Sequence, residues 1–176
     1  MKKLFLLISF TGFFACNNKE EAKIESAVSE PKEEKVEYAY TIEKPDNWET
    51  GSKRNTQIVL QALRDFEMNN IEGSLNAFSD SVELRFNEYE AKHSKAEIEK
   101  MFKENRAKYQ QLQVKMNDFE SVRSKDGKEE YVSMWYMEKW QDQNGKWDSI
   151  SIMEDVKMKD GKIIQLDQKT RKFAKK

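Results

Sequence analysis

The sequence predicts an α+β domain, and three observations carry this prediction. Apolar residues recur at helical spacing between Ile58 and Phe66, which indicates an amphipathic helix. Ser94 and Glu97 form a Ser-x-x-Glu capping box that opens another helix. Three Asn-Gly or Asp-Gly pairs separate four strand-like runs at 112–124, 129–142, 147–158 and 162–173. Helices followed by an antiparallel meander are typical of the α+β class.

The elements before the meander follow from hydrophobic periodicity. The first helix has an apolar stripe made of Ile58, Val59, Ala62, Leu63 and Phe66. Residues 71–78 indicate a short second helix, and residues 82–86 alternate as a strand does. The capped helix after Ser94 has an apolar face that we expect to comprise Ile98, Met101, Phe102, Tyr109 and Leu112. We expect the residues between that strand and this helix, His93 included, to form a loop.

Turn chemistry predicts the register of the meander. Asp126-Gly127, Asn144-Gly145 and Asp160-Gly161 suit two-residue type I′ turns, in which both residues have positive φ. These turns place Asp118, Trp135, Glu154 and Asp167 in one cross-strand row. The same face then carries Met116, Val122, Tyr131, Met137, Ile150, Ile152, Val156, Met158 and Ile163. The opposite face carries Phe119, Val132, Met134, Tyr136, Trp140, Met153, Asp155, Ile164 and Leu166. We assign the first, more apolar face to the concave side.

Two phrases resemble a known family. Residues 56–86, which run from Thr-Gln-Ile-Val-Leu-Gln-Ala-Leu to Asp-Ser-Val-Glu-Leu-Arg-Phe, look like the opening of the SnoaL-like branch of the NTF2-like superfamily. Residues 156–164, Val-Lys-Met-Lys-Asp-Gly-Lys-Ile-Ile, are similar to that group's final hairpin. The resemblance spans 52–173 and implies a cone: a curved antiparallel sheet wrapped by about three N-terminal helices around a hydrophobic pocket. Members include isomerases, cyclases, dehydratases and noncatalytic binding or dimerisation modules, so the resemblance leaves the function open.

The N-terminus has the features of a secretory signal. Lys2 and Lys3 precede a short apolar run, and Ala15 stands directly before Cys16, the only cysteine. This order resembles a bacterial lipobox, which implies a signal peptide at 1–15 and an acylated Cys16; the alternative is a buried or disulfide-bonded cysteine. The next residues, 17–21, resemble the export signal of surface lipoproteins in the Bacteroidetes. We therefore predict anchoring to the membrane through lipid on Cys16, in the cell envelope at the outer membrane, with surface exposure as an option.

Composition divides the remaining chain into a tether and one domain. Between Asn17 and Glu49 the chain has ten acids, five lysines and few large apolar residues, which is typical of disorder. We predict a tether over 16–50 and the domain over 51–176. Within the tether, Val36 to Ile42 alternate as a strand does, which makes this segment a candidate edge strand.

Charge and residue counts exclude several functions. Without residues 1–15 the chain has 29 basic and 32 acidic side chains, which argues against nucleic-acid binding. A single cysteine excludes intrachain disulfides and thiolate-built zinc or iron–sulfur sites. The sole histidine excludes a histidine-rich metal site, and no calcium-loop motif is present. We predict no metal and no cofactor.

Three residues are candidates for catalysis. In the predicted register Glu154 and Asp167 are neighbours, and two close carboxylates raise the pKa of one of them, which suits proton transfer. The alternative is that these acids pair with Lys169, Arg171 or Lys139 on a solvated surface. His93 is the only side chain with an unperturbed pKa near neutrality, and it is either catalytic or a surface histidine.

Aromatic side chains mark candidate binding surfaces. We predict that Trp135, Tyr131, Met137 and Asp118 contact a ligand in the pocket, with core and dimer packing as the alternative. Trp140 and Trp147 flank the Asn144-Gly145 turn and would form an exposed partner surface, which favours a homodimer.

Three functions remain open on the sequence. The first is an envelope lipoprotein that binds a small apolar ligand or a protein partner without catalysis. The second is a SnoaL-like isomerase, cyclase or dehydratase in which Glu154 or Asp167 transfers a proton with help from Tyr131 or His93. The third is a structural dimer module that acts through Trp140 and Trp147.

Overall fold

The computed structural model describes residues 37–43 and 47–173. The chain divides into two units, 1–41 and 42–176, and the fold below is that of the second. The predicted signal peptide, Cys16 and most of the tether lie outside the described residues. Residues 37–43 contain no strand, so the prediction of an edge strand there is wrong. Among the residues described, no helix is long and apolar enough to cross a membrane.

Three helices form before the meander. Helix α1 (Lys53–Glu67) begins at Ser52, whose side chain accepts a hydrogen bond from the Asn55 amide, and it buries Val59 and Ala62. Helix α2 (Ile71–Leu75) is short. Helix α3 (Lys95–Arg106) opens with the predicted capping box between Ser94 and Glu97. It ends earlier than expected, because Tyr109 and Leu112 already belong to the next strand.

Within the described residues, seven strands form one sheet in the order β1-β4-β5-β6-β7-β2-β3. The predicted meander is confirmed as β4 (Tyr109–Ser124), β5 (Glu130–Asp142), β6 (Trp147–Lys159) and β7 (Lys162–Lys172). Strand β2 (Phe78–Phe86) pairs in parallel with β7. Sequence patterns missed β1 (Trp48–Thr50), which lies in the segment predicted as tether, and β3 (Tyr89–Ser94), which replaces the predicted loop.

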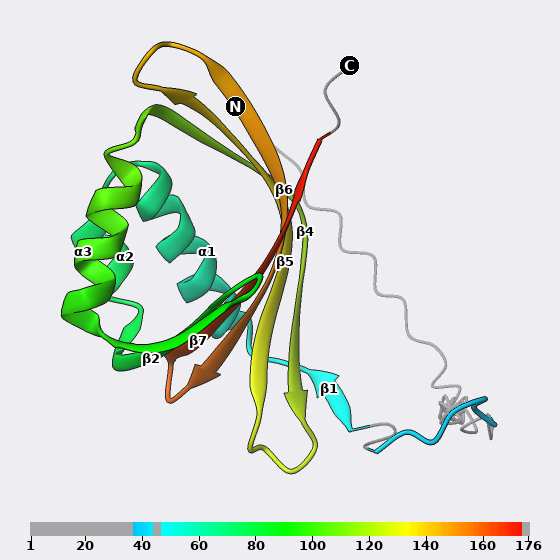
Figure 1. The fold of residues 1–176 in the computed structure, drawn as a ribbon. Coiled ribbons are helices and arrows are strands. Elements are labelled where there is room, and N and C mark those ends of the chain that lie inside the picture. Colours follow the sequence, from blue (N-terminus) through cyan, green and yellow to red (C-terminus); the bar gives the residue numbers. More distant parts are fainter. Residues whose placement is uncertain (1–36, 44–46, 174–176) are drawn as a thin grey trace, which may run out of the picture. The chain divides into compact units, whose positions relative to one another are not determined.

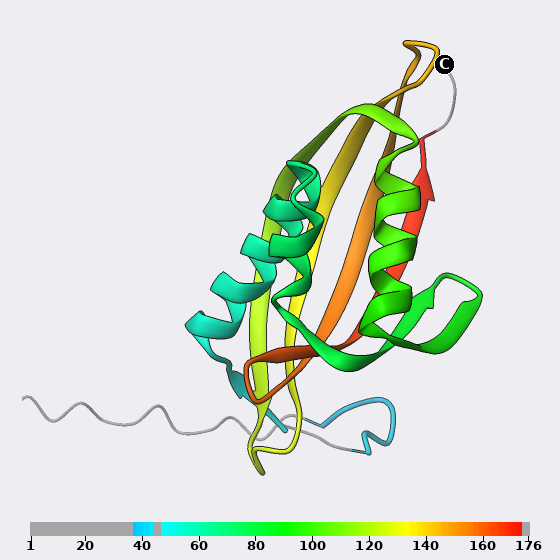
Figure 2. The same ribbon diagram turned by 90° about the vertical axis from the view of Figure 1, so that its left-hand side faces the viewer.

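All three helices lie on one face of the curved sheet, as Figures 1 and 2 show. We call this the inner face and the opposite one the outer face. Helix α1 contacts β4 and β5, and α3 contacts β2 and β3. The helices therefore cover the inner face from two sides, and the α+β prediction is confirmed.

The register differs from the prediction at the second hairpin. The Asp160-Gly161 turn is type I′, with φ of 51° and 72°. At the second hairpin only Gly145 has positive φ, and its amide donates to the Asp142 carbonyl over 3.0 Å. The loop therefore contains one more residue than a type I′ turn, and Gln141 pairs with Trp147. This shifts β6 by one residue relative to β5.

Bulges in the strands shift the register again, and two of them affect the predicted row. One lies between Met116 and Asp118 on β4, and another lies on β7 opposite Lys157 and Met158. Asp118 pairs with Trp135 as predicted, but Trp135 pairs with Met153. The predicted row of four is therefore wrong beyond its first pair.

The core lies between the helices and the inner face. Its buried residues on the sheet include Val132, Met134, Tyr136, Ile152, Val156, Met158, Ile163 and Leu166. The predicted concave face is correct for β6 and for Ile163. It is wrong for β5, where the buried residues are Val132, Met134 and Tyr136 rather than Tyr131, Trp135 and Met137.

Candidate functional site: an apolar cavity with buried carboxyl groups

A cavity of about 490 Å³ lies between the helices and the inner face. Its apolar lining is mostly aromatic or sulfur-containing and includes Phe66, Phe78, Phe86, Met101, Phe102, Tyr109 and Met134. The Phe102 ring packs edge-on against Phe66 and Phe78, with centroid distances of 5.2 and 5.5 Å. A site of this size and lining suits a small organic molecule.

Three polar side chains on adjacent strands form a hydrogen-bonded group within this lining. Glu154 on β6 is only 6% exposed. The Tyr136 hydroxyl on β5 donates a hydrogen bond of 3.0 Å to Oε2 of Glu154. Nε2 of Gln168 on β7 lies 3.4 Å from the Tyr136 hydroxyl and donates to it. Strand pairing explains the group, because Glu154 is opposite both Met134 and Gln168 in the sheet.

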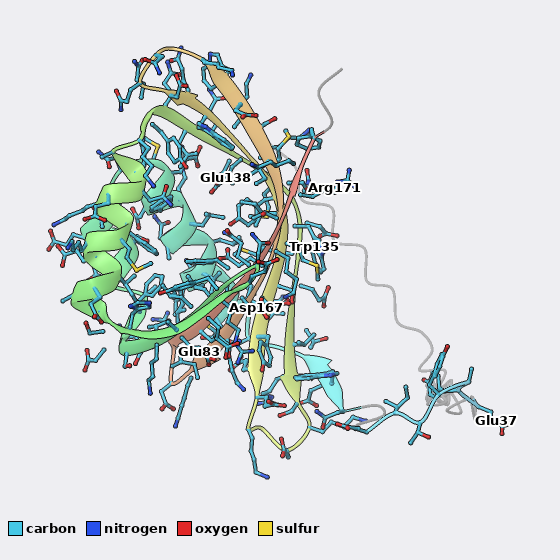
Figure 3. All side chains as sticks on the ribbon, in the orientation of Figure 1. Glu37, Glu83, Trp135, Glu138, Asp167 and Arg171 are labelled. Atoms are coloured by element: carbon cyan, nitrogen blue, oxygen red, sulfur yellow. The ribbon has the colours of Figure 1, made fainter. Side chains whose placement is uncertain are left out.

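A second carboxyl group lines the same cavity. Glu138 follows Tyr136 by two residues on β5 and also lines the cavity, so both side chains are on the inner face. Figure 3 shows Glu138 on the side of the sheet that the helices cover. Within the described part of the chain, its carboxyl group has no hydrogen-bond or ion-pair partner. The exposed residues Glu104, Asn105 and Lys108 also line the cavity, and they lie where α3 ends and β4 approaches.

Burial raises the pKa of both acids. For Glu154, removal from water raises the pKa from 4.5 to about 7, and the charge of Glu138 adds to this, whereas the hydrogen bond from Tyr136 opposes it. For Glu138, burial and the charge of Glu67 raise the pKa to about 7. Burial and Glu154 raise the pKa of Tyr136 well above 10, so its hydroxyl stays protonated and donates.

This arrangement suits proton transfer and polar recognition. A carboxyl group with a pKa near neutrality is present in both protonation states, so it is able to accept or donate a proton. The fixed Tyr136 hydroxyl orients that carboxyl, while the apolar lining excludes water from it.

Of the predicted catalytic pair, only Glu154 lies in the cavity. Asp167 pairs with Asp155 on the outer face, and its Oδ1 is 2.9 Å from Nζ of Lys169. The proximity of Glu154 and Asp167 was therefore predicted wrongly. For Asp167 the alternative, a surface ion pair with Lys169, is correct.

The four predicted ligand contacts lie on the outer face and do not line the cavity. Figure 3 shows Trp135 on the side of the sheet away from the helices. Tyr131 packs against Trp48 at 5.8 Å between centroids. Met137 and Asp118 share this face with Trp135, since Met137 is two residues away and Asp118 is opposite.

His93 lies on β3 and not in a loop, and it does not line the cavity. Its Nε2 is 2.6 Å from the Tyr89 hydroxyl, and its Nδ1 is 3.8 Å from Oε2 of Glu97. Trp140 and Trp147 do not share a surface, because their positions on the paired strands place them on opposite faces of the sheet. Trp140 packs against Tyr109 at 5.6 Å.

Sequence reasoning missed Tyr136, Glu138 and Gln168. The alternation of residues along β5 does separate its two faces, but it does not show which face is buried, because both carry large apolar residues. Only the correct register of β5 and β6 separates the inner set, which contains Tyr136 and Glu138, from the outer set.

Comparison with models of protein families found no match, and comparison with curated proteins found none either. Solved structures do match. AusH from Aspergillus nidulans has a TM-score of 0.57 and 16% identity, over 70% of this chain and 87% of AusH. The epoxide hydrolase/cyclase-like enzyme SalBIII has a TM-score of 0.57 and 14% identity, over 68% of this chain and 92% of its own.

An NTF2-like protein of unknown function from Burkholderia pseudomallei also has a TM-score of 0.57, with 12% identity over 68% of this chain and 92% of its own. At such low sequence identities, the similarity to these structures is evidence about the fold and not about the function. Together with the curved, unclosed sheet and its N-terminal helices, these comparisons show that the domain has the cone-shaped NTF2-like fold.

Proposed function

We propose that this domain binds a small, mainly apolar ligand that presents one polar group to Glu154 and Tyr136. The observation that carries the proposal is the buried Glu154 carboxyl, held by Tyr136 at 3.0 Å in an apolar cavity of about 490 Å³. Burying a carboxyl is unfavourable unless something interacts with it, so a group retained there points to recognition. A ligand hydroxyl or amine would donate to its free lone pairs, while the aromatic lining would take up the apolar body.

A second candidate is proton-transfer catalysis of the SnoaL-like kind. The pKa of Glu154 near 7 favours it, because such a group both accepts and donates a proton at neutral pH. Glu154 would take a proton from an acidic C–H or O–H of the substrate, and Tyr136 would hold the carboxylate in position. Some proteins of similar fold are described as enzymes, among them SalBIII and an epoxide hydrolase from M. tuberculosis, which supports catalysis as a candidate.

The experiment that tests binding is native mass spectrometry of the chain from residue 16 onward, with Cys16→Ser to keep it free of lipid. We expect extra mass that disappears on denaturation. Glu154→Gln should reduce the retained mass, while Asp167→Asn, which removes a carboxylate from the outer face, should not. An empty cavity in protein from several hosts would contradict the proposal. Proton-transfer catalysis would be favoured if the wild-type protein converts its ligand on incubation and the Glu154→Gln variant leaves the ligand intact.

We further propose that the protein is a lipoprotein of the cell envelope, anchored at the outer membrane through Cys16. The support is the sequence alone: the charged and apolar start, Ala15 before Cys16, and the acidic segment that follows. Homodimer formation through the outer face is also a proposal, and of the two tryptophans first considered only Trp147 lies on that face.

The anchor is testable by fractionation. Cys16→Ser should move the protein from the membrane fraction to the soluble fraction and abolish fatty-acid labelling, because the thiol is the acylation site. Ser26→Ala, in the same acidic segment, serves as the matched control and should stay with membranes. Continued labelling of Cys16→Ser would contradict the anchor.

A further inference from the structure

The charged side chains that line the cavity are mainly acidic. They are Glu104, Glu138 and Glu154, against a single basic residue, Lys108, which is exposed. We propose that the ligand is a lipophilic amine whose ammonium group pairs with Glu138. This inference rests on the proposed ligand-binding function and specifies its chemical class.

The two buried acids of the cavity, Glu138 and Glu154, differ in their partners. Within the described ranges no side chain or backbone group hydrogen-bonds to its carboxyl, and no cation pairs with it, although it lines an apolar cavity. Glu154, by contrast, already accepts from Tyr136. A partly buried carboxylate without a counter-ion is unfavourable, so a cationic ligand would supply the missing partner.

The position of Glu138 suits an amine at one end of an elongated ligand. Glu138 and Tyr136 are two residues apart on one strand, which corresponds to about 7 Å. Glu138 lies nearer than Tyr136 to the end of β5 at Asp142. With an ammonium group at Glu138, a second polar group of the ligand would be within reach of Tyr136, and the aromatic side chains that line the cavity would contact its apolar body.

The lining also favours a cation over an anion. Aromatic rings attract cations through their negative faces, and the cavity contains five of them besides Tyr136: Phe66, Phe78, Phe86, Phe102 and Tyr109. An organic carboxylate would instead meet like charge at Glu138 and Glu154. A metal ion is a poor fit, because hard cations require several oxygen ligands at once, and among the described residues no three or more His, Cys, Asp or Glu side chains lie close enough together to hold one.

The test uses three probes of matched size: phenylbutylamine, phenylbutanol and phenylbutyrate. Their affinities are measured by calorimetry on the chain from residue 16 with Cys16→Ser, at about pH 8, where acids with a pKa near 7 are mostly ionised. We expect the amine to bind at least about tenfold more tightly than the alcohol, and the carboxylate to bind most weakly.

Glu138→Gln should bring the amine-to-alcohol ratio to within about threefold of unity, because it removes the charge and keeps the shape. Glu120→Gln removes an exposed carboxylate of β4 that does not line the cavity, and it should keep the ratio. As a check that needs no variant, addition of phenylbutylamine should shift the carboxyl carbon resonance of Glu138 in the wild-type protein.

The outcomes separate the two proposals. If the alcohol binds as tightly as the amine, the amine inference is overturned while ligand binding stands. If the amine preference survives in Glu138→Gln, or the Glu138 resonance does not respond to the amine, the role of Glu138 is overturned. If none of the three probes binds, both the amine inference and the proposed binding function are contradicted.

Discussion

Glu154 is a carboxyl group that the fold removes from water, and this makes stability depend on pH. Its folded pKa of about 7 lies above the ordinary value of 4.5, so between these values the folded protein holds a proton that the unfolded chain has released. The contribution of the group to stability is therefore fully present below about pH 4.5 and is lost as the pH rises to about 7. The pKa of Glu138 is also raised, by burial and by the charge of Glu67, so this group too makes the protein less stable as the pH rises.

Glu154→Gln should remove much of this pH dependence. The variant should be more stable than wild type at about pH 8, by up to about 3 kcal/mol, because the glutamine carries no charge that must be buried. Near pH 4.5 the two proteins should be about equally stable. Guanidinium unfolding at both pH values measures this, with Glu120→Gln as the exposed control. Parallel pH profiles for wild type and Glu154→Gln would contradict a buried, shifted carboxyl.

Tyr136 contributes by donating to Glu154, and its removal tests that bond. Tyr136→Phe should lower the free energy of unfolding at about pH 8 by roughly 1.5–3 kcal/mol, because the acceptor is then largely ionised and loses its donor. Tyr131→Phe makes the same change on the outer face and should cost less. Equal losses in the two variants, measured by urea unfolding, would show that the Tyr136 hydroxyl has no special role.

At the level of elements, most of the fold was predictable from local sequence. Helices α1 and α3 follow from apolar spacing and from the Ser94–Glu97 capping box. The four long strands follow from alternation between turn residues. The short strand β1 was not predictable, because its three residues carry no periodic signal and gain their structure by pairing with 122–124.

The register was predictable only in part, since one residue in a loop or bulge inverts a face. The pair Asn144-Gly145 is typical of a type I′ turn. In the structure, however, the Asp142 carbonyl accepts a hydrogen bond from the Gly145 amide, and the loop is one residue longer than a type I′ turn. The bulge on β7 then reverses the faces of that strand, and it leaves Leu166 buried inside while Asp167 points outward. Neither the loop type nor the bulge has a sequence signal strong enough to choose between the two registers.

The loop geometry makes a prediction of its own. Gly145→Ala should destabilise the protein by about 1 kcal/mol, because φ is +81° there, while Asn144→Ala should cost much less, since Asn144 has a negative φ. A type I′ turn would require positive φ at both positions and would make both variants costly. Thermal unfolding of the two variants distinguishes these cases, and equal losses would favour the type I′ turn.

At the scale of the whole molecule, the two faces of the sheet differ in how their charged side chains are surrounded. On the outer face, acidic side chains form ion pairs with basic side chains of the same sheet. Lys169 lies near both Asp155 and Asp167, and Arg85 pairs with Glu83. Such pairs are solvated and contribute little to stability. The inner face instead packs against the helices and leaves a cavity in which, among the residues that the structure describes, Glu138 and Glu154 have no basic partner.

This division also explains why the site was only partly predictable. Glu154 was found because it lies on a strand whose inner set was assigned correctly. Tyr136 was placed on the wrong face because β5 is apolar on both sides, and only the position of the helices decides which side is covered. Glu138, which shares the face of Tyr136, was therefore not considered as a pocket residue.

A carbon-13 NMR titration of the glutamate side chains in the wild-type protein tests directly whether Glu154 is a buried acid with a raised pKa. We expect Glu154 to titrate near pH 7, well above the ordinary glutamate value of 4.5, because burial raises its pKa. A Glu154 pKa near 4.5 would mean that water reaches the carboxyl freely, and it would contradict the buried acid on which the proposed site depends.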